Sequence, residues 1–189
     1  MVKKLSAGDA AQGDNFGWDV DLDGDWIIAG APLHDGAGVD AGSAYAFGRN
    51  EGGADNWGQA AQLAGNGVES QDHFGWSVAI SGTQAVVGAP GDDDKGPDAG
   101  AAYRFNGAAN WAQTAKLLGA QTSAGDNFGR SVAASGNYAF IGAPYNDLGG
   151  DDAGAAFLFN QIGQSSLVVN YNAQDGDNFG ATVSIDGDY

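Results

Sequence analysis

The sequence predicts an all-β protein, a β-propeller assembled from four-stranded blades. Three observations lead to this prediction. Phe-Gly pairs begin at Phe16, Phe74, Phe128 and Phe179, at spacings of 58, 54 and 51 residues along the 189-residue chain. Each repeat contains four short apolar segments separated by glycine-rich turns, and none shows the sustained 3.6-residue period of a helix. Repeats of this length with four strands match propeller blades better than a sandwich.

Further motifs keep a constant place within each repeat. A Gly-Ala-Pro sequence starts 14 residues after each of the first three phenylalanines, at Gly30, Gly88 and Gly142. An Asp-Ala-Gly sequence follows at Asp40, Asp98 and Asp152. Because order and spacing recur together, these motifs indicate one structural unit used several times.

Each repeat is expected to form strands A to D in chain order. In the second repeat, strand A covers 74–80, strand B 85–88, strand C 101–105 and strand D 111–118. Strands A and B are joined by a tight turn at an X-Gly pair, where glycine accepts a positive φ. The predicted turns are Asp23-Gly24, Ser81-Gly82, Ser135-Gly136 and Asp186-Gly187.

The repeat also sets the expected segment boundaries. Leu5 lies 11 residues before Phe16, the offset that also separates Leu63 from Phe74. We therefore expect three complete blades, preceded by a D strand and followed by an A strand. The segments are the end of a preceding blade (1–15), three blades (16–73, 74–127 and 128–178) and the first strand of an incomplete blade (179–189).

Three blades are too few to close a propeller, which needs at least four. The chain is then a piece of a longer protein, or it assembles with other copies, or its blades stack in an open array. The expected partners at its open edges are further blades of the same longer chain or other copies.

The pairing of Phe-Gly with Gly-Ala-Pro resembles the FG-GAP repeat of the integrin alpha-chain propeller. The short blade, with Asn110-Trp111 before the segment that ends at Leu117, is more similar to the FG-GAP repeats of large bacterial secreted proteins. This resemblance covers nearly the whole chain. It implies a propeller, usually seven-bladed, in an extracellular or cell-surface protein.

The composition restricts the partners. The formal net charge is −17, and seven Lys and Arg residues are too few for a nucleic-acid interface. Cysteine is absent, which excludes disulfides and thiolate metal sites, and no apolar run reaches membrane-span length. Met1 to Ser6 lacks the apolar region of a signal peptide, so a secretion signal would have been removed or would lie outside this chain.

Nearly all the acidic residues are aspartates, which favour turns and oxygen-rich cation sites. A solubilising acidic surface is the alternative. Asp19, Asp21, Asp23 and Asp25 suggest the calcium loop of integrin-type repeats. The 14-residue offset is too short for that loop, so these aspartates are expected at solvent-side strand positions and in a turn.

The loops between strands B and C are the better candidates for a calcium site. Glycine-rich turns with several carboxylates can supply the six to eight oxygens that calcium takes. The candidate metal ligands are Asp35, Asp40, Asp92, Asp93, Asp94, Asp98, Asp147, Asp151 and Asp152. Alternatively, Asp40, Asp98 and Asp152 cap the turn through backbone hydrogen bonds, and Asp92 to Asp94 form a solvated acidic loop.

An aspartate also precedes every Phe-Gly pair, at Asp14, Asp72, Asp126 and Asp177. Its fixed place predicts that it ties its own loop through the backbone, with a shared cation as the alternative.

Catalysis is not expected. His34 and His73 occupy unmatched positions in different repeats, and no Ser/His/Asp set or phosphate-binding glycine loop is present. The sequence predicts a non-catalytic binding or adhesion module, calcium-stabilised, that docks a protein or glycan on its loop-bearing face. A structural subunit of an extracellular fibre or coat, and an accessory propeller of a larger secreted enzyme, are the alternatives.

Overall fold

The computed structural model describes residues 3–187, which form three four-stranded antiparallel sheets. The strands are β1 (Val20–Asp23), β2 (Trp26–Ala31), β3 (Ser43–Gly48), β4 (Gly58–Leu63), β5 (Ser77–Ser81), β6 (Gln84–Ala89), β7 (Ala101–Asn106), β8 (Ala112–Leu117), β9 (Ser131–Ser135), β10 (Tyr138–Ala143), β11 (Ala155–Phe159) and β12 (Ser165–Val168). One short 3-10 helix, Gly107–Ala109, precedes β8. The strands of each sheet pair in chain order, as the four segments of each repeat predict.

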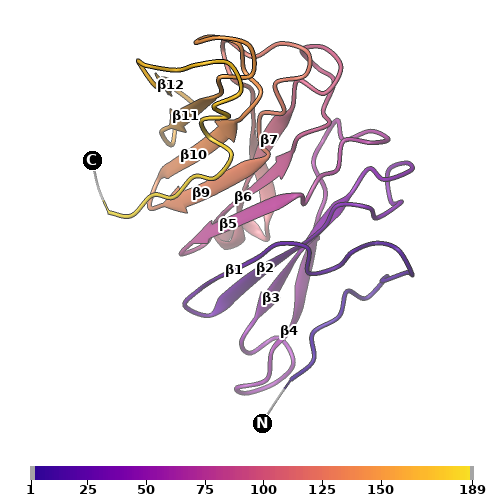
Figure 1. The fold of residues 1–189 in the computed structure, drawn as a ribbon. Coiled ribbons are helices and arrows are strands. Elements are labelled where there is room, and N and C mark those ends of the chain that lie inside the picture. Colours follow the sequence, from indigo (N-terminus) through magenta and orange to yellow (C-terminus); the bar gives the residue numbers. More distant parts are fainter. Residues whose placement is uncertain (1–2, 188–189) are drawn as a thin grey trace.

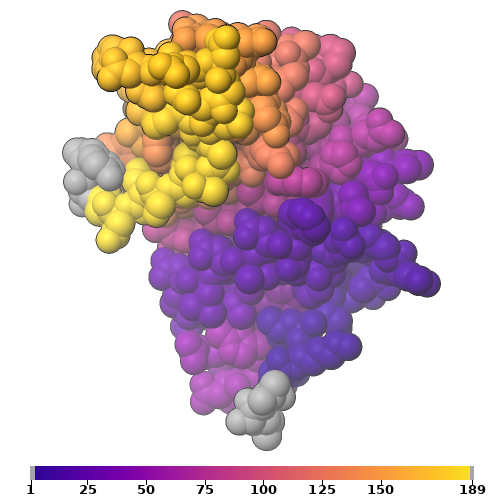
Figure 2. All heavy atoms as spheres, in the orientation of Figure 1, coloured from indigo at the N-terminus to yellow at the C-terminus, as the bar shows by residue number. Residues whose placement is uncertain are grey.

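The three sheets are arranged as propeller blades (Figure 1). Their first strands, β1, β5 and β9, lie side by side at the inner edge, and the sheets fan outward from them. The packed atoms of the three blades follow one another from the N-terminal to the C-terminal part of the chain (Figure 2). The predicted β-propeller architecture is confirmed.

The turns between inner strands lie one residue later than the sequence predicts. Asp23 pairs with Trp26, so the two turn residues are Gly24 and Asp25. Gly24 occupies the first turn position with a φ of 58°, and Gly82 and Gly136 do the same in the other blades. A glycine with positive φ at this position is typical of a type II′ turn, which matches the twist of the flanking strands.

The core lies between neighbouring blades, and each interface is centred on the phenylalanine of a Phe-Gly pair. Phe74 contacts Tyr103 and Phe105 edge-on, with ring centroids 5.2 and 5.9 Å apart. This trio packs against Ile28 and Leu63 of the preceding blade. The third blade repeats the arrangement with Phe128, Phe157 and Phe159. Aromatic burial therefore joins the blades to one another.

The glycines of the two motifs meet at the inner part of each interface. A Cβ atom on Gly88 would lie 1.9 Å from the carbonyl oxygen of Gly129 in the next blade. The same contact joins Gly30 to Gly75, at 2.0 Å, and Gly142 to Gly180, at 1.9 Å. No side chain fits between backbones at such distances. Glycine is therefore required at these positions by the approach of two blades, and this contact is called the glycine joint below.

The two end strands expected from the sequence are not formed. Residues 3–19 contain no strand, although Leu5 and Ala7 pack against Ala29 and Tyr45 of the first blade. Residues 179–187 also contain no strand, and Phe179 makes only an isolated bridge with Gly154. Each end segment lacks the neighbouring strand that would complete its hydrogen-bond ladder within this chain. The first and last two residues of the predicted end segments lie outside the described residues.

The inner strand of the first blade, β1, also has one face that no other blade of the described residues covers. Val78 and Ile80 of β5 are 4% and 5% exposed because the first blade covers them. The equivalent Val20 and Leu22 of β1 are 59% and 57% exposed. The apolar side chains of β1, whose equivalents in β5 are buried, are therefore exposed at an open face of the first blade.

We predict that G88A destabilises the protein by about 3 kcal/mol, because the added methyl overlaps the backbone of Gly129 and the blades must separate. G8A is the control, since its Cβ would meet only the flexible end of Gln59, at 3.5 Å. Urea unfolding of both variants measures the difference. Equal stability of G88A and G8A would contradict the glycine joint.

Candidate binding rim

The loops between strands B and C and the loops before the last three Phe-Gly pairs lie together at one end of the blades. We call this surface the loop rim; it comprises residues 33–42, 64–73, 91–100, 118–127, 145–154 and 169–178. Backbone hydrogen bonds join each B–C loop to the loop that enters the next blade. Gln71, Gly125 and Gly176 donate to the carbonyls of Val39, Pro97 and Asp151, respectively. The rim is therefore one surface held together by hydrogen bonds rather than a set of independent loops.

Each B–C loop is closed by an aspartate carboxylate. The Oδ1 atom of Asp93 accepts the N–H of Asp98 at 2.8 Å. Asp35 accepts the N–H of Asp40, and Asp147 that of Asp152, at 2.9 Å in both cases. These hydrogen bonds are turn caps, the alternative to a calcium site, but a different residue makes them. The capping carboxylate belongs to the aspartate five residues before the one that the sequence suggests.

The last aspartates of these loops contribute through their backbone. Asp40, Asp98 and Asp152 have φ values of 51°, 53° and 53°, in the left-handed region that aspartate tolerates better than most residues. The carbonyls of Asp98 and Asp152 accept the N–H groups of Asn127 and Asn178, at 3.0 and 3.1 Å. These residues turn the chain and connect it to the next blade.

The aspartate before each Phe-Gly pair ties its own loop, as predicted. Asp72 accepts the N–H of Glu69 at 2.8 Å, three residues upstream. Asp14, Asp126 and Asp177 accept the equivalent N–H groups of Ala11, Ser123 and Gln174.

The second blade concentrates charge at the rim. Asp92 is 1% exposed, and its Oδ2 atom accepts the hydroxyl proton of Tyr103 at 2.8 Å. Lys116, from the outer strand β8, places its Nζ atom 2.6 Å from Asp92 and 2.7 Å from Asp94. Burial alone would lower the pKa of Lys116, but its hydrogen bonds to these two carboxylates raise it above the ordinary value. The ammonium group thus occupies the space between two of the predicted metal ligands.

Asp72 lies beside this pair. It is 3% exposed and, with Glu69 and the Asp92–Asp94 run, lines a cavity of about 170 Å³. Burial, reinforced by the negative charges of Asp92 and Asp93, raises the pKa of Asp72 to about 6. Lys116 offsets this repulsion only in part.

In the other two blades, the position equivalent to Asp92 carries a different side chain. In the third blade, Asn146 replaces Asp92 and donates from its amide to Asp126. In the first blade, His34 replaces it, and its Nε2 atom lies 3.2 Å from Asp9. The carboxylate pair is therefore particular to the second blade, although the backbone around it repeats.

No group of three or more His, Cys, Asp or Glu side chains is arranged to hold a metal ion among residues 3–187. Asp35, Asp93 and Asp147 accept backbone N–H groups, and Asp92 and Asp94 bind Lys116. The side chain of Asp151 makes none of the hydrogen bonds or ion pairs described above. Calcium binding by the nine predicted aspartates stays a prediction, which melting with and without a chelator would test.

The aspartates of the first blade that resemble a calcium loop have a role that the sequence did not reveal. Asp19, Asp21 and Asp23 accept the N–H groups of Val78, Ile80 and Gly82 in the next blade, at 2.7, 2.8 and 2.6 Å. These N–H groups lie on the free edge of β5, where no strand pairs with them. Burial raises the pKa of Asp19, while the N–H groups of Val78 and Val20 oppose the shift. The expected solvent-side position is therefore wrong for Asp19 and Asp21, and Asp23 ends β1 rather than lying in the turn.

The residue after each Phe-Gly pair forms a row across the three blades. The rings of Trp18 and Trp76 are 5.1 Å apart. The guanidinium of Arg130 lies 5.2 Å from the ring of Trp76 and 5.8 Å from that of Tyr145, a residue of the third B–C loop. We call Trp18, Trp76, Arg130 and Tyr145 the aromatic row. The sequence shows that this position varies, but not that its side chains contact one another.

We predict that D72N makes stability less sensitive to pH. The folded pKa of about 6 exceeds the ordinary value of 3.8, so the wild type loses stability as the pH rises through this interval. The loss persists above it. Asparagine does not titrate, and its oxygen can still accept the N–H of Glu69. Relative to wild type, D72N should gain about 2 kcal/mol between pH 4 and pH 7.

Urea unfolding at both pH values measures this gain. D126N is the matched control, because the side chain beside Asp126 is the amide of Asn146 rather than a second carboxylate. If both variants change equally between the two pH values, burial alone accounts for the gain and repulsion between Asp72 and Asp92 adds nothing to it.

Comparison with known proteins places this geometry in a family. The profile of the FG-GAP repeat matches residues 1–47, 57–105 and 111–159. The second match begins at β4 and ends within β7, and the third runs from β8 to β11, so each of these two family units contributes its first strand to one blade and its other strands to the next. A search of curated proteins gave no match.

The fold is also similar to a solved structure, that of the computationally designed protein Ika8. The TM-score is 0.50, at 14% sequence identity. The likeness covers 84% of this chain and 37% of the designed chain, so the chain spans well under half of the length of that protein. It supports the fold alone. Since the family profile covers most of the sequence, the chain belongs to the FG-GAP repeat family.

Proposed function

We propose that this propeller segment is a non-catalytic, extracellular or cell-surface binding module that docks a protein or glycan on its loop rim and on the aromatic row that borders it. The single observation that carries the proposal is the aromatic row. FG-GAP propellers are often extracellular binding modules and are generally non-catalytic, which agrees with this reading. No helix of the described residues is long and apolar enough to cross a membrane.

The aromatic row has the properties of a recognition surface. Trp18 is 52% exposed although its ring packs at a tilt against that of Trp76, so a large apolar face is held in place and open to solvent. Arg130 adds hydrogen-bond donors beside these rings. Tryptophan and arginine side chains supply much of the binding energy at many interfaces, and ordering a tryptophan costs little entropy because its ring has only two rotatable bonds.

The surroundings of the row favour a specific ligand. The row differs from blade to blade, whereas the glycine joint beneath it repeats. The acidic cavity at Asp72 and Asp92 lies on the same rim and gives the surface a polar, negative part. A protein or glycan that presents an apolar face next to hydrogen-bonding groups would fit this combination.

A binding screen with an array of glycans and a panel of extracellular proteins tests the proposal. For any ligand found, W18A and W76A should each weaken binding at least about tenfold. W57A is the control, because Trp57 contacts Arg49 near the start of β4, at the end of the blade away from the rim. A ligand whose affinity is unchanged by W18A and W76A would show that the row is not the site.

We also propose that the open faces bind further FG-GAP blades, either of a longer chain or of other copies. The supporting observation is the exposure of Val20 and Leu22, whose equivalents in the second blade are buried. At the opposite face, Phe140, Leu158 and Val168 line a cavity of about 200 Å³. The isolated chain should therefore associate in sedimentation experiments, and V20T/L22T should reduce this association. A stable monomer at all concentrations would contradict this proposal.

A further inference from the structure

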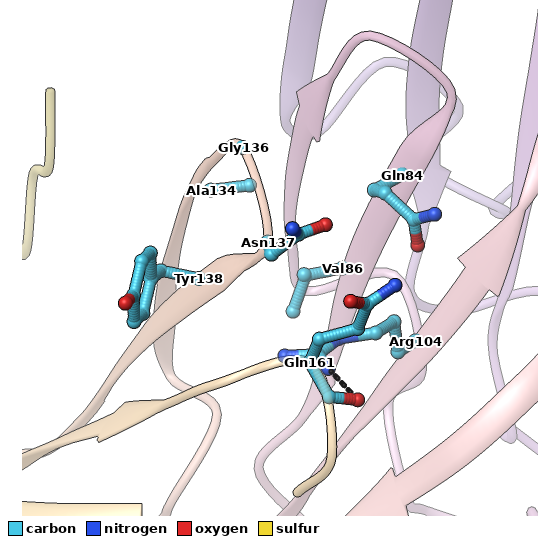
Figure 3. A pocket seen from close by; sticks show the side chains of 8 residues that line it. All are labelled: Gln84, Val86, Arg104, Ala134, Gly136, Asn137, Tyr138 and Gln161. Carbon is cyan, nitrogen blue, oxygen red and sulfur yellow. Dashed lines mark hydrogen bonds between the residues drawn. The ribbon is translucent and has the colours of Figure 1, made fainter. Parts of the chain in front are cut away.

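A cavity of about 370 Å³ opens on the loop rim of the first blade, and we call it the first-blade cavity. Its lining residues include Asp9, His34, Ala37, Gln62 and Gly65. By contrast, the cavity beside the buried Arg104, near the turn between β9 and β10, holds about 10 Å³ and has room for one water molecule (Figure 3). The first-blade cavity has room for a small ligand or for a long side chain of a partner.

In the second blade, lysine side chains extend from two of the equivalent positions. Lys116 occupies the position of Gln62, and its ammonium group lies 2.6 Å from Asp92. Lys95 occupies the position of Ala37, and its ammonium group donates to two backbone carbonyls of the loop after β8, at 2.6 and 3.3 Å. The second blade therefore supplies two ammonium groups of its own, whereas the first blade supplies none from these positions.

The first blade nevertheless has a carboxylate at the equivalent tyrosine. In the second blade, the hydroxyl of Tyr103 donates to Asp92 at 2.8 Å. In the first blade, the hydroxyl of Tyr45 donates to Oδ1 of Asp9 at 2.9 Å. The two carboxylates come from different loops but accept from the same place in the blade.

The repeat shows how Asp9 lies relative to a lysine ammonium group. Asp9 stands seven residues before Phe16, and Gly67 stands seven residues before Phe74, so the two positions are equivalent. A Cβ atom on Gly67 would lie 3.8 Å from Nζ of Lys116. An ammonium group placed in the first blade as that of Lys116 is placed in the second would therefore lie beside the side chain of Asp9.

The charge of Asp9 is open to such a partner. Its Oδ2 atom lies 3.2 Å from Nε2 of His34, but Nδ1 of that ring accepts the N–H of Gly36, so the imidazole carries one proton and is neutral. Burial raises the pKa of Asp9, but the hydrogen bond from Tyr45 and the other nearby groups lower it by more, so the carboxyl is ionised at neutral pH. Within residues 3–187, no lysine or arginine forms an ion pair with Asp9. Its side chain is 43% exposed and keeps free lone pairs.

We propose that the first-blade cavity binds a primary alkylammonium group, with Asp9 as its counter-ion. The ammonium takes the place that Lys116 fills in the second blade. The carbonyl of Gly65, equivalent to the Gly119 carbonyl that accepts from Lys95, offers a further acceptor. Val68 lines the same cavity and supplies apolar contact for the methylene groups of the ligand. The net charge of −17 also attracts cations to this surface.

An NMR titration of the isotope-labelled chain with Nα-acetyl-lysine methylamide tests the proposal. The backbone amide signals of Ala37, Gly42 and Gly65, which line the cavity, should shift and saturate with a Kd in the millimolar range. The same probe acetylated on its side-chain nitrogen has no positive charge and should cause no saturable shift. Equal shifts with the two probes would overturn the proposal.

Variants locate the site. D9N should weaken binding of the lysine probe at least about tenfold, because asparagine still accepts the Tyr45 hydroxyl proton but carries no charge. Q62K should weaken it as well, since its own ammonium group would fill the site as Lys116 does. D25N is the matched control, because it removes one exposed carboxylate in the β1–β2 turn, and it should keep the Kd within about twofold. Undiminished binding by D9N would overturn the proposal.

Butylamine, titrated in parallel, distinguishes the two sources of such a ligand. Tighter binding of the lysine probe would assign the site to a lysine of a polypeptide partner, and equal Kd values would assign it to free alkylamines. The site lies apart from the aromatic row, so these measurements stand whether or not that row binds a ligand.

Discussion

The close approach of glycine backbones in neighbouring blades is the constraint on which the rest of the structure depends. A side chain at Gly88 or Gly129 would hold the second and third blades apart. The phenylalanine beside the joint could then no longer cover the apolar face of the preceding blade. Because the second and third family units also give their first strands to the previous blade, neighbouring repeats are joined by the chain, by the core and by the joint.

The glycine joint requires the same backbone arrangement in every blade, whereas the side chains at the rim are free to differ. Backbone positions at the rim recur in all three blades, with the same turn-closing carboxylates and left-handed aspartates. Side chains mounted on this frame differ. His34, Asp92 and Asn146 share one place but make different contacts, and the aromatic row changes from tryptophan to arginine. Such a frame can present a particular chemistry in each blade at little cost to the fold.

The sequence was sufficient for the architecture because each repeat carries its own strand and turn signals at fixed offsets. The sequence-based predictions were wrong where the structure depends on a neighbour outside the repeat. The predicted end strands lack partners, and Asp21 serves an N–H group 59 residues away, which no local pattern reveals. Lys116 lies in β8 and Asp92 in the loop after β6, so the position of the ammonium group between the carboxylates became visible only in three dimensions. Arg104 gave one signal in the sequence, a charge where the other repeats have Ala46 and Leu158.

Hydrogen exchange at the joint tests the central claim most directly. The N–H groups of Phe74 and Phe128 donate to the carbonyls of Ala41 and Ala99 in the preceding blades, at 2.9 and 3.0 Å. If the joint holds the blades together, both amides should exchange as slowly as those of the buried strand β6, because they open only when the blades separate. Rapid exchange of these two amides, while β6 and β10 stay protected, would show that the blades are stable without the joint.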